Sequence, residues 1–123
     1  MPKENVRTKR VADLIQKELA QILLREAKDP RFGLLSISNV AVSKDLSFAK
    51  INISLLGETI PVKEVLKILN NSAGYFRSLL AKTIQLRIVP KIAFYYDDSL
   101  RRGSELSVLI NEAVAKDQKK RID

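Results

Sequence analysis

The 123-residue chain contains neither cysteine nor histidine, and these two gaps exclude most of the side-chain chemistry that enzymes use. Without cysteine there are no disulfides, thiolate metal ligands or thiol nucleophiles. Without histidine there is no imidazole metal ligand and no acid–base step or triad that depends on imidazole. Carboxylates, lysine, tyrosine, serine and threonine remain, so we expect a protein that is not an enzyme and that holds no cofactor and no metal.

Long apolar runs and glycine-rich loops are missing too. No stretch approaches the roughly 18 apolar residues of a membrane span, and residues 1–5 lack the apolar core of a signal peptide. We therefore expect a cytoplasmic protein with no membrane partner. A glycine-rich phosphate loop is also absent, because the four glycines stand alone at Gly33, Gly57, Gly74 and Gly103.

Positive charge is in clear excess. The chain has 22 lysine and arginine residues against 14 aspartate and glutamate residues, a formal net charge of +8. On a chain of this length the excess favours a polyanionic partner, and nucleic acid is the commonest one. Hydrophobic residues make up 46% of the chain, which is enough to build one hydrophobic core.

Apolar spacing predicts the order helix, strand, strand, helix, helix, strand, helix. We expect an α+β fold with helices packed on one face of a three-stranded sheet, as one domain over 1–115 with a charged tail over 116–123. The predicted elements span about residues 5–27, 34–44, 47–56, 62–69, 76–84, 86–97 and 100–116.

Two strands carry local signals. In 34–44 the apolar residues change parity, and a bulge near Ser38–Asn39 would return them to one face. In 86–97, Pro90 cannot donate a ladder hydrogen bond, so this strand is expected at a sheet edge or with a bulge. Residues 43–46 have the composition of a turn that joins the first two strands.

A run of poor helix formers, residues 70–74, separates the two central helices. We expect a sharp kink at Ser72, Ala73 and Gly74, where small side chains let the two backbones approach closely. The element order is similar to that of the type II KH fold, which binds single-stranded nucleic acid. KH domains grip the nucleic-acid backbone with a GXXG loop, and here the kinked helix pair replaces that loop.

Basic side chains recur in most of these elements, and we expect them to bind RNA. The first helix carries a basic stripe separate from its apolar face, although a solvated face gives the same pattern. Phosphate contacts of this kind position a protein without reading base sequence. The predicted set is Lys3, Arg7, Arg10, Lys17, Lys44, Arg77, Lys82, Arg87, Lys91, Arg101 and Arg102.

Three alternatives stay open. Tyr95 or Phe48 could stack on an RNA base, although packing in the core or at its rim is the favoured interpretation of either residue. Asp97 and Asp98 could serve a carboxylate-dependent nuclease, although neighbours on a strand point to opposite sides. The sheet edge near Pro90 could bind another protein.

Short motifs that follow one another between about Val6 and Leu109 resemble one family. They include Arg10-Val11-Ala12, Asp29-Pro30-Arg31, Val40-Ala41-Val42-Ser43-Lys44-Asp45-Leu46, Ala73-Gly74-Tyr75-Phe76-Arg77 and Arg87-x-x-Pro90-x-Ile92-x-Phe94-x-x-Asp97-x-Ser99. In this order they are similar to ribosome-binding factor A, a family of bacterial small-subunit assembly factors. That family often has Ala-x-Gly at the kink, where this chain has Ser72-Ala73-Gly74.

The resemblance implies a specific role. Such proteins bind the free or immature 30S subunit, assist 16S rRNA maturation at the 5′ end and in the decoding region, and support growth after cold shock. A ribosome-assembly GTPase promotes their release, and the family is not known for catalysis. The expected partners are therefore 16S rRNA, the small ribosomal subunit and that GTPase, with the chain itself expected to be a monomer.

Overall fold

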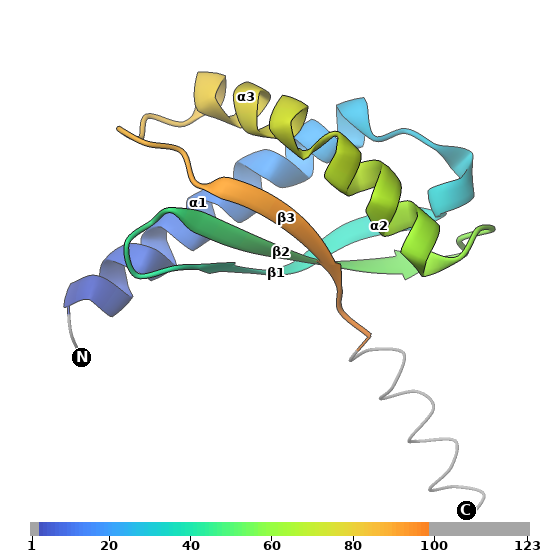
Figure 1. The fold of residues 1–123 in the computed structure, drawn as a ribbon, viewed down its shortest axis with the longest axis horizontal. Coiled ribbons are helices and arrows are strands. Elements are labelled where there is room, and N and C mark those ends of the chain that lie inside the picture. The colour runs from blue at the N-terminus through green and yellow to red at the C-terminus, as the bar shows by residue number, and fades with distance from the viewer. Residues whose placement is uncertain (1–2, 99–123) are drawn as a thin grey trace, which may run out of the picture.

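The computed structural model describes residues 3–98, with side chains from residue 6 onward. The helix predicted over 100–116 and the tail over 116–123 lie outside this range, as do the ends of the predicted 1–115 domain. Within it, the predicted α+β order of helix, strand, strand, helix, helix, strand is confirmed (Figure 1). The elements are α1 (Lys3–Glu26), the short 3-10 helix η1 (Pro30–Phe32), β1 (Leu34–Val42), β2 (Phe48–Leu56), α2 (Val62–Asn71), α3 (Ala73–Thr83) and β3 (Lys91–Tyr96).

The sheet has the order β1-β2-β3, with β1 antiparallel and β3 parallel to β2. The predicted bulge is present, because Ile37 pairs with Ile53 while Asn39 pairs with Asn52, which leaves Ser38 as the extra residue. The side chains on both sides of the bulge accordingly pack against one core. The position of β3 at an edge agrees with the expectation from Pro90.

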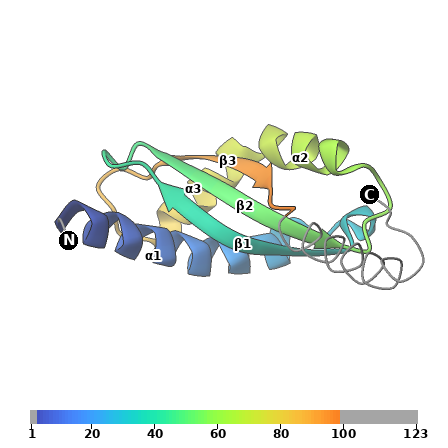
Figure 2. The ribbon, with the colours of Figure 1, turned by 90° about the horizontal axis from the view of Figure 1, so that it is seen from below.

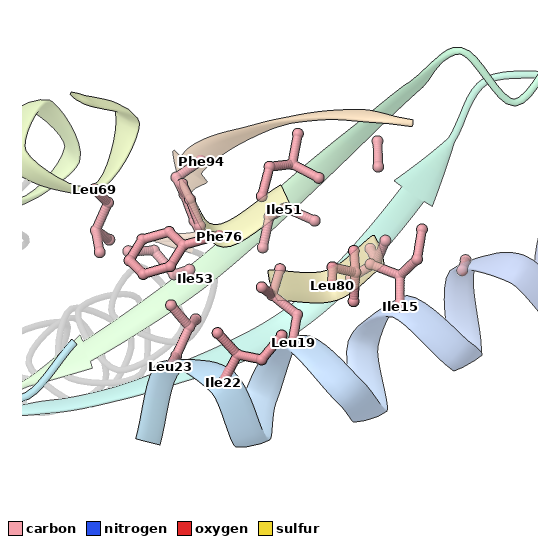
Figure 3. Packing of buried hydrophobic residues seen from close by; sticks show 14 of the residues in the cluster. Ile15, Leu19, Ile22, Leu23, Ile51, Ile53, Leu69, Phe76, Leu80 and Phe94 are labelled. Atoms are coloured by element: carbon pink, nitrogen blue, oxygen red, sulfur yellow. The ribbon is translucent and has the colours of Figure 1, made fainter. Parts of the chain in front are cut away.

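The core lies between one face of the sheet and the helices. Alternate residues of β2 are buried, while those between them are exposed or half-buried. In Figure 3 the side chains of Ile51 and Ile53 meet those of Leu19 from α1 and Leu80 from α3. Phe76 of α3 packs edge-to-face on Phe94 of β3, with ring centroids 5.9 Å apart. No polar or charged side chain is buried in the part of the chain that the structure describes.

The last strand begins later than predicted. The sequence pattern placed its start at Leu86, but β3 starts at Lys91 and residues 84–90 form an irregular loop. Pro90 lacks the N–H that a ladder needs, and its side chain is fully buried. The guanidinium of Arg77 donates to the carbonyl oxygens of Val89 and Pro90, at 2.7 to 3.2 Å. Those hydrogen bonds tie the loop to α3.

At Phe94, the outer edge of β3 is satisfied by a side chain instead of a fourth strand. The Asn70 amide accepts from the Phe94 N–H at 2.7 Å and donates to the Phe94 carbonyl at 3.1 Å. This pairing copies one step of a β-ladder and ties the end of α2 to the sheet. The edge near Pro90, which was a candidate for binding another protein, therefore has several of its backbone groups occupied within the chain.

The kink between the two central helices lies where the sequence predicted it. Ser72 has φ −103° and ψ 8°, and it separates α2 from α3. The expectation that small residues allow a close approach of the backbones is wrong at Gly74, because a Cβ there would meet nothing within 4 Å. The break arises at Ser72, whose N–H donates to the Leu69 carbonyl at 3.1 Å and whose carbonyl accepts from the Phe76 N–H at 3.0 Å.

The turn from α1 into the sheet depends on Gly33. Asp29 caps η1 by accepting from the Arg31 N–H at 3.0 Å, and its carboxylate also binds the Arg31 guanidinium. Gly33 then adopts φ +65°, and a Cβ at this position would collide with the backbone of residues 56–58. Only glycine satisfies both the positive φ and the close approach.

We expect Gly33→Ala to lower the free energy of unfolding by about 3 kcal/mol, because strain at positive φ and a backbone collision combine. Gly57→Ala is the matched control. Gly57 also has positive φ (+81°), but a Cβ there would meet nothing within 4 Å, so its cost is about 1 kcal/mol. Urea denaturation of the two variants measures both values, and equal losses would show that the close approach at Gly33 has no energetic weight.

The β1–β2 turn is organised by one carboxylate. Asp45 accepts hydrogen bonds from the Ser47 hydroxyl at 2.7 Å, the Ser43 hydroxyl at 2.8 Å and the Ser47 N–H at 3.1 Å. Leu46 completes the turn at φ 62°, an uncommon value for a residue other than glycine. The hydrogen bonds, chiefly from Ser47 and then Ser43, hold the pKa of Asp45 below its ordinary value of 3.8.

A carboxylate whose pKa is lowered by folding stabilises the fold above its unfolded-state pKa, and this contribution is lost as the pH falls through the lower folded-state pKa. We therefore expect Asp45 to titrate below 3.8 in the folded chain. Replacing both Ser43 and Ser47 with alanine should move the pKa back toward 3.8, because both hydroxyl donors are lost. Carboxyl ¹³C NMR over an acid titration measures the pKa directly, and an equal pKa in both proteins would refute this description of the turn.

Candidate nucleic-acid interface

Six of the predicted RNA-binding residues lie at one end of the molecule. The N-terminal half of α1, the β1–β2 turn, the end of α3, the loop 84–90 and the start of β3 all meet there (Figure 1). All six side chains are exposed. We call this region the basic end, and it consists of Arg7, Arg10, Lys44, Lys82, Arg87 and Lys91.

The packing of α3 on α1 brings the first of these elements together. The Tyr75 hydroxyl, at the start of α3, donates to the Glu26 carboxylate at the end of α1 at 2.9 Å. The two helices therefore run in opposite directions from this point. Lys82 lies seven residues further along α3, at the end of this helix that lies nearer the N-terminus of α1 (Figure 1).

The sheet supplies the rest of the basic end. The Lys91 N–H donates to the Ser47 carbonyl at 3.0 Å, and Lys91 pairs with Phe48. The start of β3 therefore lies beside the turn that carries Lys44. Arg87 lies in the loop just before this point, and not on the strand where the sequence pattern placed it.

Arg77 has a different environment from the other predicted residues. It is half-buried, and its guanidinium makes the three contacts to Val89 and Pro90 described above. These contacts fix the loop that carries Arg87. The structure thus gives Arg77 a positioning role toward its own chain, and direct RNA binding by this side chain stays a prediction.

The remaining predicted residues are not part of the basic end. Lys17 is exposed in the middle of α1. The kink at Ser72–Gly74 lies near the C-terminal end of α1, where Ser72 and Glu26 line a cavity of about 190 Å³. The side chain of Lys3 and the whole of Arg101 and Arg102 lie outside the described residues, so their placement stays a prediction.

One basic residue at the sheet was missed by the sequence interpretation. Lys50 lies on β2, and its ammonium group is 4.7 Å from the ring centroid of Tyr95 on β3. The signal was available, because Lys50 alternates with the apolar residues of its strand and must therefore face away from the core. Lys9 was also left out, and it forms an exposed ion pair with Asp13 at 3.8 Å.

The carboxylates do not form a metal site within the described part of the chain. No group of three or more acidic side chains that could hold a metal ion occurs among residues 3–98. Asp97 accepts a hydrogen bond from the Ser38 hydroxyl at 2.7 Å, so it is tied to the bulge of β1. In the same range, no helix combines the length and the apolar character that crossing a bilayer requires.

Comparisons with known proteins agree on one family. The family model for ribosome-binding factor A matches residues 7–110. A relative of that name from Pseudomonas aeruginosa (strain UCBPP-PA14) is 49% identical over 125 residues, which cover 100% of this chain and 97% of the relative. The relative covers every element described above, and the family model covers all of them except residues 3–6 of α1.

Solved structures of the same name share the fold. The crystal structure of ribosome-binding factor A from Thermus thermophilus superposes with a TM-score of 0.63 at 21% identity, covering 72% of this chain and 94% of that one. A homology model of the Thermus thermophilus protein, fitted into a cryo-EM map of a complex of 30S with ribosome-binding factor A, gives a TM-score of 0.60 at 22% identity, covering 69% of this chain and 89% of that one. These structures show the shared fold, while the family model and the Pseudomonas relative lead to one conclusion: this chain belongs to the ribosome-binding factor A family.

Proposed function

We propose that this chain is a ribosome assembly factor that binds the free or immature 30S subunit through its basic end. In this proposal it assists late 16S rRNA maturation, at the 5′ end and in the decoding region, without catalysing a reaction. The observation that carries the proposal is the convergence of six exposed cations from five segments of the chain. Family membership and the 30S complex of the Thermus thermophilus protein support the choice of partner.

The chemistry of the basic end suits folded RNA. Exposed lysine and arginine side chains neutralise phosphates and release counterions, which favours binding to any dense array of phosphates. Four of the six cations (Arg7, Arg10, Lys82 and Lys91) lie on helices or at the start of a strand, so the fold sets the spacing of their backbone positions before binding. Arg77 contributes indirectly in this scheme, because it holds the loop that presents Arg87.

Binding without chemistry can still assist maturation. A protein that binds one conformation of the subunit more tightly than others increases the population of that conformation. The proposed action is therefore to hold an rRNA arrangement that processing and folding require. A monomer acts in the cytoplasm in this scheme, during growth after cold shock among other conditions, and a ribosome-assembly GTPase promotes its release.

The electrostatic part of the proposal has a direct test. Arg10→Gln combined with Arg87→Gln should weaken binding to purified free 30S subunits about tenfold, because two phosphate contacts are lost. The slope of log affinity against log salt should fall by about two. Co-sedimentation with free 30S subunits, 50S subunits and 70S ribosomes at several salt concentrations measures affinity, slope and preference together.

The matched control removes the same charge elsewhere. Lys63 and Lys67 are exposed on α2, which lies at the end of the molecule away from the N-terminus of α1 (Figures 1 and 2). Lys63→Gln combined with Lys67→Gln should leave the affinity within about twofold of the wild type, since surface charges beyond a Debye length are screened. Equal losses from both pairs, or a salt response that is flat for the wild type, would refute the proposed interface.

A further inference from the structure

The face of the sheet that points away from the core is not covered by any described element. Residues of β2 that alternate with the buried ones face outward here, and so do Lys91, Ala93 and Tyr95 of β3. Pairing between strands places Phe48 beside Lys91, Lys50 beside Ala93, and Asn52 beside Tyr95. We call this surface the open face.

Two aromatic rings are exposed on the open face. Phe48 is 36% exposed and Tyr95 is 42% exposed, whereas Ile51 and Phe94, which point to the core from the same two strands, are at most 2% exposed. Phe48 and Tyr95 lie on adjacent strands and on one face of the sheet, and RNA-binding sheets such as that of the RRM stack bases on aromatic side chains of one face. Tyr95 pairs with Asn52, so it lies four residues along from Phe48, or about 13 Å at the rise of a strand. A short single strand of a few nucleotides spans this separation.

The charge along the open face changes from positive at the Phe48 end to negative beyond Tyr95. Lys91 and the turn that carries Lys44 lie at the Phe48 end, so this end of the face continues into the basic end. Lys50 lies between the two rings, with its ammonium group 4.7 Å from the ring centroid of Tyr95. Beyond Tyr95 the chain continues into Asp97 and Asp98, which repel phosphate. An anionic strand therefore meets favourable charge from Lys91 as far as Tyr95, and unfavourable charge after it.

We propose that the open face is a stacking platform for single-stranded RNA, in which Phe48 and Tyr95 each hold one base while Lys50 and Lys91 bind the phosphates between them. This inference rests on the proposed function and adds to it: the basic end binds folded rRNA, and the open face takes an unpaired segment next to it. Stacking on aromatic rings tolerates any base sequence, so the platform selects unpaired RNA and not a particular sequence.

Lys50 has to move when a base binds. It now covers part of the Tyr95 ring, but it is exposed and its flexible side chain has other low-energy positions. A base that stacks on Tyr95 replaces the ammonium group, which is then free to bind the adjacent phosphate. The contact that keeps Tyr95 covered without RNA thus becomes a phosphate contact in the complex.

The test uses the full chain and a fluorescein-labelled hexa-adenylate RNA at low salt, followed by anisotropy. Tyr95→Leu keeps an apolar side chain but removes the aromatic ring, and it should weaken binding about tenfold. Phe48→Leu should have a similar effect for the same reason. Tyr95→Phe should bind within about twofold of the wild type, because stacking needs the ring and not the hydroxyl.

Tyr75→Leu is the matched control. Tyr75 is 52% exposed on α3, on the side of the sheet where the helices pack, so its loss should not change the affinity for the hexamer. Circular dichroism of each variant checks that the fold is intact. The proposal is overturned if Tyr95→Leu binds the hexamer as tightly as the wild type, if Tyr75→Leu loses as much affinity, or if the wild type does not bind the hexamer.

Failure here is distinguishable from failure of the proposed function. If the open face takes no RNA, Arg10→Gln with Arg87→Gln will still weaken binding to 30S subunits, while the aromatic variants bind the hexamer normally. If the aromatic variants lose 30S binding but keep hexamer binding, the open face contacts a ribosomal protein, and the RNA platform is refuted. If the aromatic variants lose both 30S binding and hexamer binding while their fold stays intact, the result supports the RNA platform.

Discussion

The apolar side chains that point from β2 toward α1 and α3 determine how the rest of the molecule is arranged. They bury one face of the sheet against the helices, and the core so formed contains no polar side chain within the described residues. Period-two alternation then sends Phe48 and Lys50 to the opposite face. The same packing lays α3 along α1, and the last turn of α3, which carries Lys82, lies at the end of the molecule that also holds the β1–β2 turn. The basic end and the open face are both consequences of this one-sided burial.

Much of the fold could be predicted because its signals are local. Periodicity identified the helices and strands, the parity change in β1 predicted the bulge at Ser38, and poor helix formers predicted the kink at Ser72. The start of β3 could not be predicted, because it depends on Arg77 binding the carbonyl of Val89, twelve residues away. The role assigned to Gly74 was wrong for a related reason: a glycine at a break in periodicity does not reveal whether another backbone lies close.

The candidate interface was predictable as a set of residues but not as a surface. The sequence identified Arg10, Lys44 and Arg87 as candidates, yet only the tertiary packing brings them to one end. The sequence also could not distinguish a cation that positions its own chain from a cation that binds RNA, because Arg77 and Lys82 are both basic residues on the same predicted helix. Lys50 was overlooked although its alternation with the apolar residues of β2 already indicated that it faces away from the core, and only the structure shows that it lies beside Tyr95.

Hydrogen–deuterium exchange of the full chain, alone and bound to purified free 30S subunits, tests most directly whether the basic end is the surface that binds. We expect slower exchange in the bound state within the turn 43–47 and the loop 84–90, because these segments carry Lys44 and Arg87 into the interface. No change is expected in α2, which lies at the other end of the molecule. Protection of α2 and the kink at Ser72, with no change in the turn and the loop, would contradict binding through the basic end.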